Sequence, residues 1–148
     1  MMMRTLITYT FAISALLAIL CSCSAPPKGQ LVLARDGVVS IDTRALARGQ
    51  ARFYHYNKDG KDIVFFVARP DTGEVKVAFD ACVTCYPNKK GYRLEAGSVV
   101  CIHCGTAFKI DELDVGKGNC IPIKIRHTTR GDTVLIDQKD IEAGACWF

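Results

Sequence analysis

Four of the eight cysteines form two closely spaced pairs, and these are the residues in the sequence best suited to chemistry. Cys82 and Cys85 form one C-x2-C knuckle, Cys101 and Cys104 form another, and 15 residues separate the two. A C-x2-C turn directs two sulfurs to one point, so two such turns supply four thiolates in a tetrahedral arrangement. That arrangement suits zinc, a single iron or a two-iron, two-sulfide cluster. The spacing therefore predicts a metal site with these four cysteines as ligands.

Paired cysteines have two other common uses, disulfides and redox-active dithiols. In an exported protein the four cysteines could instead form two disulfides, and the compartment alone favours that interpretation. Two knuckles with Gly105 directly after the second are more typical of metal sites than of stapled loops. A thioredoxin-like dithiol is disfavoured, because neither pair lies between a strand and a helix.

The three histidines are not predicted to be ligands or catalytic groups. His103 lies between two ligands and is expected to face solvent, His55 alternates with tyrosines along a strand, and His127 lies near a turn. The sequence contains no nucleophile–base–acid arrangement and no phosphate-binding loop, so it is not predicted to be an enzyme.

The N-terminus has the pattern of an export signal. Residues 1–22 contain Arg4 and a run of about 15 uncharged, mostly apolar residues, which is short of the roughly 20 that a membrane-spanning helix needs. The segment around Cys23 resembles a bacterial lipobox, which predicts that Cys23 is lipidated. Residues 23–30 would then be the lipid anchor and an extended tether. The mature protein is expected to be a membrane-anchored lipoprotein that faces the periplasm or the cell exterior.

The elements that must position the cysteines are predicted to be strands. Beyond the tether, apolar residues alternate or occur in short blocks between turn residues, and no 3.6-residue period persists. Residues 51–56, 63–68 and 75–79 are expected to form a meander. Hairpins are expected at Asp36-Gly37 and at residues 129–132, with strands at 121–125 and 133–136 around the second turn. One helical turn is expected within 42–48 and a short closing helix at 138–143.

Length and charge limit the possible functions. The chain has 148 residues, of which 126 remain after the predicted signal peptide, enough for one modest core over 31–148. The net charge of +4 comes from 19 scattered basic residues against 15 acidic ones, so no nucleic-acid partner is predicted.

The second knuckle resembles part of a known cluster-binding motif. Residues 101–111, C-I-H-C-G-T-A-F-K-I-D, resemble the second cluster loop of Rieske proteins, C-P-x-H-G-x-x-F-D, with Cys104 where those proteins have histidine. The resemblance implies an all-β, Rieske-like β-sandwich in which cysteines replace the histidine ligands. Thiolate ligands would lower the potential of a two-iron cluster from the Rieske range toward that of plant ferredoxins.

A resemblance to the FtrD-like family covers more of the chain. Residues 78–85, 90–92, 99–108 and 118–123 are similar to that family's pattern, and residues 53–56 and 64–67 fit it upstream. The family is described as membrane iron-sulfur proteins, often associated with iron-permease uptake systems. This chain departs from it at Asn119 and Ile121, and by its lipobox in place of a polytopic membrane segment.

The family resemblance also gives Cys120 a place near the metal. Cys120 matches a family position, which implies an accessory ligand or a resolving thiol at the site. Cys146 matches no family position, and a disulfide between Cys120 and Cys146 is the simpler alternative.

Together these inferences lead to one principal hypothesis and two alternatives. The principal hypothesis is a lipid-anchored protein whose four knuckle cysteines hold a two-iron, two-sulfide cluster. It would pass electrons or handle metal for a membrane or periplasmic redox or iron-permease partner. The first alternative is a zinc-stapled structural or interaction domain, in which a closed four-sulfur shell has no catalytic position. The second is a periplasmic metal chaperone or sensor that uses Cys120 in transfer.

Overall fold

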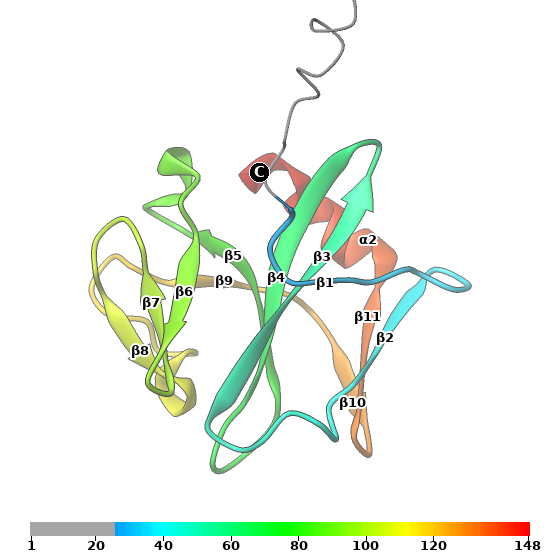
Figure 1. Cartoon of the computed structure of the whole chain (residues 1–148), viewed down its shortest axis with the longest axis horizontal. Coiled ribbons are helices and arrows are strands. Elements are labelled where there is room, and N and C mark those ends of the chain that lie inside the picture. The colour runs from blue at the N-terminus through cyan, green and yellow to red at the C-terminus, as the bar shows by residue number, and fades with distance from the viewer. Residues whose placement is uncertain (1–25) are drawn as a thin grey trace, which may run out of the picture.

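The computed structural model describes residues 26–148, and Figure 1 shows their arrangement. The predicted signal peptide and Cys23 lie outside the described residues. The strands are β1 (Gln30–Leu31), β2 (Val38–Asp42), β3 (Gln50–Lys58), β4 (Lys61–Arg69), β5 (Lys76–Cys82), β6 (Tyr92–Glu95), β7 (Ser98–Cys101), β8 (Ala107–Lys109), β9 (Pro122–Lys124), β10 (Thr128–Arg130) and β11 (Thr133–Asp137). The helical segments are the 3-10 turns η1 (Tyr86–Asn88), η2 (Ile110–Glu112) and η3 (Ala143–Trp147), and the helix α2 (Gln138–Glu142). None of the helices in this part of the chain has the length and apolar character to cross a membrane.

A five-stranded sheet with the order β1-β3-β4-β5-β9 forms the centre of the molecule. Strands β3, β4 and β5 are antiparallel neighbours, which confirms the predicted meander. The continuous apolar run of β4 is explained by its place in this sheet, because both of its faces are covered.

A three-stranded sheet with the order β10-β11-β2 lies on one side of the central sheet (Figure 1). Asp36 and Gly37 both have positive φ and make the predicted tight turn, closed by hydrogen bonds between Arg35 and Val38. The strand before this turn does not continue as a hairpin partner of β2. Instead β1 pairs in parallel with β3, which Gly29 makes possible, since a Cβ at Gly29 would overlap the backbone of Phe53.

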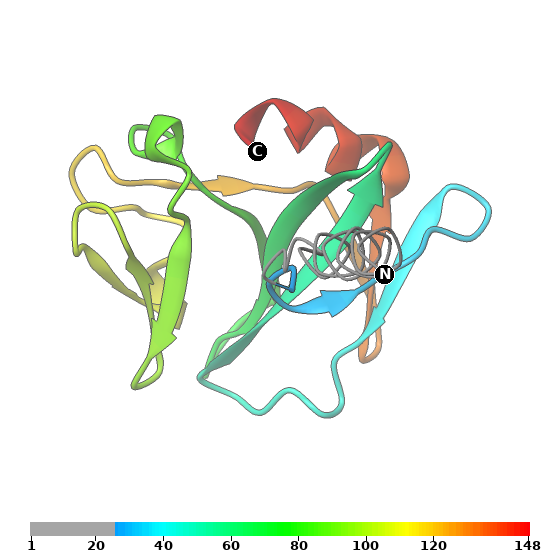
Figure 2. The ribbon, with the colours of Figure 1, turned by 45° about the horizontal axis from the view of Figure 1, so that its top comes forward.

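The other hairpin prediction also needs one correction. The turn at residues 129–132 joins β10 to β11, whereas β9 leaves that hairpin and pairs with β5. The predicted closing helix is present as α2, followed by η3 (Figure 2). The predicted helical turn within 42–48 is limited to a single bond from the Leu46 amide to the Thr43 carbonyl.

The third sheet, β6-β7-β8, was not predicted as strands and lies on the opposite side of the central sheet from β10-β11-β2 (Figure 1). Its first hairpin turns at Ala96 and Gly97, both with positive φ. β7 ends at Cys101, so this sheet delivers the second knuckle to the site.

Two apolar clusters form the core, one on each face of β4. Phe65 and Val67 belong to one cluster, and Phe66 and Ala68 belong to the other. The second cluster also contains the buried aromatic residues of the small sheet and three buried cysteines, namely Tyr92, Phe108, Cys82, Cys101 and Cys120. The all-β class is confirmed, and the Rieske-like arrangement stays a prediction.

Candidate metal centre

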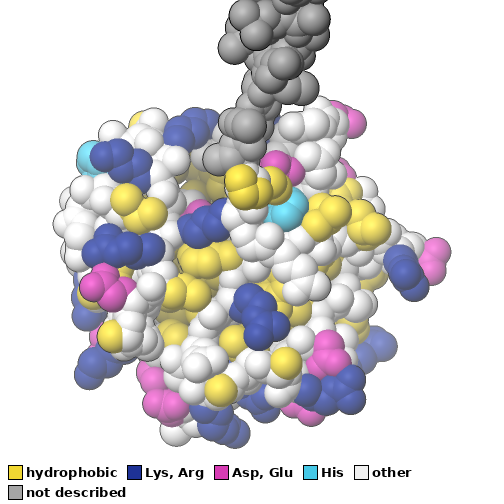
Figure 3. Space-filling view, in the orientation of Figure 1, with side chains coloured by type: hydrophobic (Ala, Val, Ile, Leu, Met, Phe, Trp, Pro, Cys, Tyr) yellow, Lys and Arg dark blue, Asp and Glu magenta, His cyan; other side chains and the backbone are white. Residues whose placement is uncertain are grey.

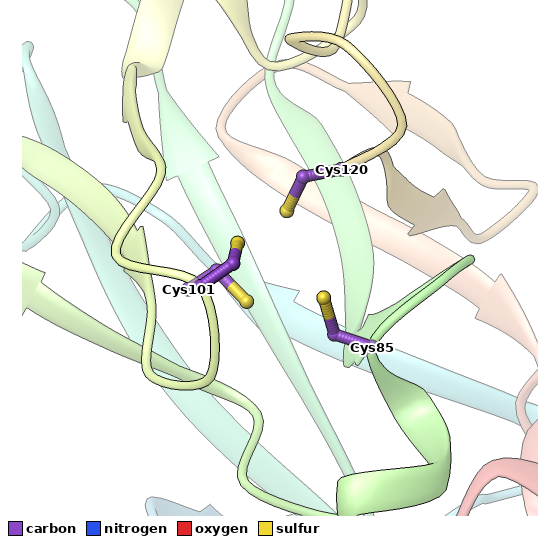
Figure 4. Close-up of side chains that lie close together, drawn as sticks. Cys85, Cys101 and Cys120 are labelled. Carbon is purple, nitrogen blue, oxygen red and sulfur yellow. The ribbon is translucent and has the colours of Figure 1, made fainter.

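Three separate segments bring five cysteines to one place. Cys82 is the last residue of β5, and Cys85 follows in the turn before η1. Cys101 is the last residue of β7, and Cys104 follows in the turn before β8. Cys120 lies two residues before β9. Figure 4 shows the side chains of Cys85, Cys101 and Cys120 directed toward one another from these segments.

The sulfurs of four cysteines are close enough to bind one metal ion together. The sulfur atoms of Cys85, Cys101, Cys104 and Cys120 all lie within 4.8 Å of one another. Four sulfurs around a metal ion at about 2.3 Å each would be about 3.8 Å apart in a tetrahedron. The spacing of the four thiols therefore fits a tetrahedral thiolate site with small adjustments.

Cys82 lies beside this group rather than within it. Its sulfur is 3.3 Å from the Cys120 sulfur, and both residues are buried. Three of the four predicted ligands, Cys85, Cys101 and Cys104, thus belong to the compact group, and Cys120 is its fourth member. Only the family position had pointed to Cys120, because a single cysteine has no spacing signal of its own.

The predicted alternative, a disulfide between Cys120 and Cys146, is not formed. Both residues are free thiols. Cys146 is exposed in η3, where its thiol lies 3.7 Å from the Ala143 carbonyl oxygen, whereas Cys120 is buried among the other cysteines.

Backbone hydrogen bonds shape the second knuckle. The Gly105 amide donates to the Cys101 carbonyl, and the Cys101 amide donates to the Thr106 carbonyl, each over 2.9 Å. Gly105 has a φ of 74°, a conformation that favours glycine, which explains the glycine directly after the knuckle. The Ile102 amide bonds to the Gly91 carbonyl and ties the turn to the chain that follows the first knuckle.

Two of the cysteines have a pKa below the ordinary value of a thiol. The Thr106 hydroxyl, 3.1 Å from the Cys104 sulfur, and the Thr106 amide lower the pKa of Cys104 to about 6. Burial by itself raises the pKa of Cys82, but the amides of Cys85, Thr84 and Ile121 and the Cys120 thiol outweigh burial and lower it.

Burial dominates at two other cysteines and favours the thiol. It raises the pKa of Cys85 to about 12 and the pKa of Cys120 well above its ordinary value, and neighbouring cysteines add to both shifts. A bound cation would reverse this preference, because a coordinated thiol loses its proton.

A buried hydroxyl at the site also fits a thiolate-bound centre. The Tyr92 hydroxyl has no hydrogen-bond partner within the described part of the chain. Burial raises the pKa of Tyr92 far above its ordinary value, and the neighbouring Cys82, Cys120 and Cys101 sulfurs raise it further. Since a metal-bound thiolate accepts hydrogen bonds, the centre would supply the acceptor that this hydroxyl lacks.

An ion pair between buried Asp80 and half-buried Lys28 lies next to Cys82. Asp80 accepts a hydrogen bond from the Tyr92 amide over 2.6 Å and forms an ion pair with Lys28 at 2.7 Å. Burial raises the pKa of Asp80, and the charge of Lys28 opposes that shift. Lys28 to Gln30, which sequence analysis placed in the tether, therefore lie against the folded domain.

The histidines are separate from the cysteine group. His103 is exposed between Cys101 and Cys104, as expected. His55 is buried on β3, and His127 lies before β10 with both ring nitrogens 3.0 Å from backbone carbonyl oxygens. The four-membered sulfur group contains no histidine.

Comparison with known proteins gives one match. Neither a curated protein nor a solved structure matches the chain. The family model described as membrane iron-sulfur containing protein FtrD-like matches residues 46–148, which include all five clustered cysteines. The chain therefore belongs to the FtrD-like family of membrane iron-sulfur containing proteins.

Proposed function

We propose that this chain is an exported, membrane-anchored, non-enzymatic protein that holds an iron-sulfur centre and transfers electrons or handles metal in iron uptake. Membership of a family of iron-sulfur containing proteins carries the choice of an iron-sulfur centre, and the convergence of four thiols within 4.8 Å of one another supports a metal site there. Cys85, Cys101 and Cys104 would hold the centre, together with Cys82 or Cys120. A bound two-iron, two-sulfide cluster would supply one-electron chemistry.

The exposure of the site suits exchange with a partner protein. Cys104 is exposed and Cys85 is half-buried, whereas Cys82, Cys101 and Cys120 are buried, so the Cys104 end of the second knuckle is the open side of the proposed centre. Ile102 in the same turn is 40% exposed and Val83 in the other turn is 51% exposed. These apolar side chains would contact a membrane or periplasmic redox or iron-permease partner there. Figure 3 shows Lys and Arg side chains spread over the visible face of the molecule with acidic side chains between them.

The first test is the metal content and visible spectrum of the full chain, purified in detergent without oxygen. The proposal expects two irons and two acid-labile sulfides per chain, visible charge-transfer bands and a reversible one-electron wave. A colourless protein that binds neither iron nor sulfide after anaerobic reconstitution would contradict it.

A zinc site is the second candidate, and the compactness of the thiols favours it. Sulfurs within 4.8 Å of one another suit a single tetrahedral ion without separation of the ligand pairs. The site would then stabilise the fold and have no redox role. One zinc per chain and no colour in the same measurement would select this candidate.

The proposed membrane anchor has its own test. The Cys23→Ala variant should lose labelling by a radioactive fatty acid and move from the membrane to the soluble fraction, because Cys23 is the proposed lipidated residue. Cys21→Ala is the matched control and should keep both properties. Equal labelling of Cys23→Ala and the unchanged chain would rule out this anchor.

A further inference from the structure

Five thiols converge where a tetrahedral centre needs only four ligands. We propose that Cys82 and Cys120 are alternative ligands for one position of the centre, and that the one left unbound donates an S–H···S hydrogen bond to the other. This inference rests on the proposed metal site, but it does not depend on which metal binds there.

The distances between sulfurs identify this pair. Cys120 belongs to the group whose four sulfurs lie within 4.8 Å of one another, and Cys82 is 3.3 Å from Cys120. The two sulfurs are therefore close enough for either one to face the same position of the proposed centre. Both residues are buried, at 2% and 5% exposure, so water does not compete for the unbound thiol.

Each thiol of the pair has a feature that suits a ligand. Cys120 completes the compact group with Cys85 and both cysteines of the second knuckle. Cys82 has the backbone amides of Thr84, Cys85 and Ile121 facing its sulfur, as a thiolate in a knuckle requires. Cys120 thus has the position of a ligand, and Cys82 has the hydrogen-bond donors of one. Each of the two thiols could therefore serve as the fourth ligand.

The backbone keeps the two sulfurs together. The Val83 amide donates to the Ile121 carbonyl over 3.0 Å, and the Thr84 hydroxyl donates to the Asn119 carbonyl. Cys82 also lies opposite Pro122 in the pairing of β5 with β9. These contacts join the residues on both sides of Cys120 to the first knuckle, so the pair stays adjacent whichever sulfur binds.

Cys104 is the matched comparison, because the proposal gives it no alternative ligand. It is exposed and projects from the other knuckle, and water is the group that would replace its sulfur. Cys146, the remaining cysteine of residues 26–148, lies in η3 against the Ala143 carbonyl.

The test uses the full chain loaded with Co2+ alone, without oxygen, because cobalt–thiolate absorption reports how many sulfurs bind. Cys82→Ser and Cys120→Ser should each keep the four-thiolate absorption of the unchanged chain. Cys104→Ser and the double variant should each lose roughly a quarter of it, because one of four sulfurs is removed. Circular dichroism of each variant verifies the fold.

Several results would overturn the inference. If either Cys82→Ser or Cys120→Ser loses a thiolate like Cys104→Ser, that residue is a sole ligand. If Cys104→Ser also keeps four thiolates, replacement of a lost ligand is not specific to Cys82 and Cys120. If the double variant fails to fold, the comparison of the cobalt absorption of each single variant with that of Cys104→Ser still tests the inference. A chain that shows this cobalt pattern but assembles no iron-sulfur cluster would refute the proposed function and leave the inference standing.

Discussion

Cys104 differs from the other cysteines of the centre in combining exposure with a low pKa. Hydrogen bonds from the hydroxyl and amide of Thr106 lower its pKa to about 6, so the metal-free protein carries a thiolate there at neutral pH. The thiolate is the reactive form of cysteine. If a metal ion binds at the proposed centre, this exposed thiolate would be the first ligand that it meets.

In the metal-free chain, Cys104 should be the cysteine of the centre that iodoacetamide alkylates first at pH 7. Its rate should fall as the pH drops through about 6, because protonation of the thiolate removes the nucleophile. Peptide mass spectrometry after short exposures measures the rate for each cysteine.

Thr106→Val supplies the control for this prediction. It removes the hydroxyl donor and keeps the amide, so the pKa of Cys104 should rise and the alkylation profile should move to higher pH. An unchanged profile in Thr106→Val, or earlier alkylation of Cys85, would contradict the electrostatic account.

At the residue scale, sequence reasoning found the paired cysteines because their spacing is itself a structural signal. Cys85, Cys101 and Cys104 lie in the compact sulfur group as expected. The spacing of the cysteines could not show which of Cys82 and Cys120 belongs to the compact sulfur group. Their 3.3 Å contact depends on the pairing of β5 with β9, which brings together residues 38 positions apart.

At the scale of elements, the His127 side chain links the segment after β9 to the segment before β5. Its Nδ1 lies 3.0 Å from the Ile125 carbonyl oxygen after β9, and its Nε2 lies 3.0 Å from the Val75 carbonyl oxygen before β5. The side chain is partly buried, so water replaces these bonds only in part.

His127→Phe should lower the free energy of unfolding by about 1–3 kcal/mol, because it removes the ring N–H that donates to one of these partly buried carbonyl oxygens. Urea denaturation of the metal-free chain measures the change. His103→Ala, at an exposed histidine, is the control and should change stability by no more than about 0.5 kcal/mol. Equal stability of the two variants would show that the His127 contacts contribute nothing.

Sequence patterns predicted the elements unevenly for physical reasons. The meander of β3, β4 and β5 was predicted because its strands are long and joined by clear turns. The small sheet of β6, β7 and β8 was missed, since its strands have three or four residues each, too few for a clear alternation. The partners of β1 and β9 are distant in sequence, and no local pattern identifies them.

At the scale of the whole molecule, the two apolar clusters of the core differ in their cysteine content. The cluster between the central sheet and β10-β11-β2 contains no cysteine. The cluster beside β6-β7-β8 contains Cys82, Cys101 and Cys120 among its buried residues. A metal bound by these cysteines would therefore stabilise mainly the apolar cluster beside β6-β7-β8.

Removal of the metal with a chelator should increase amide hydrogen exchange in β6, β7 and β8 and leave β2 and β11 protected. The physical reason is that the small sheet packs on the apolar cluster that contains Cys82, Cys101 and Cys120, whereas β11 pairs along its length with β2 in the other sheet. Exchange followed by mass spectrometry compares the two forms. A uniform increase over both regions would show that the molecule unfolds as one unit.

The all-β class and the two cysteine knuckles could be predicted from the sequence, because strand alternation and C-x2-C spacing are local properties of the chain. Only the folded chain shows that Cys120, and not Cys82, completes the compact sulfur group, that Cys146 is a free exposed thiol and that Cys104 is the exposed member of the group. Those features follow from strand pairing between distant segments and from the burial that pairing creates, which no local pattern encodes.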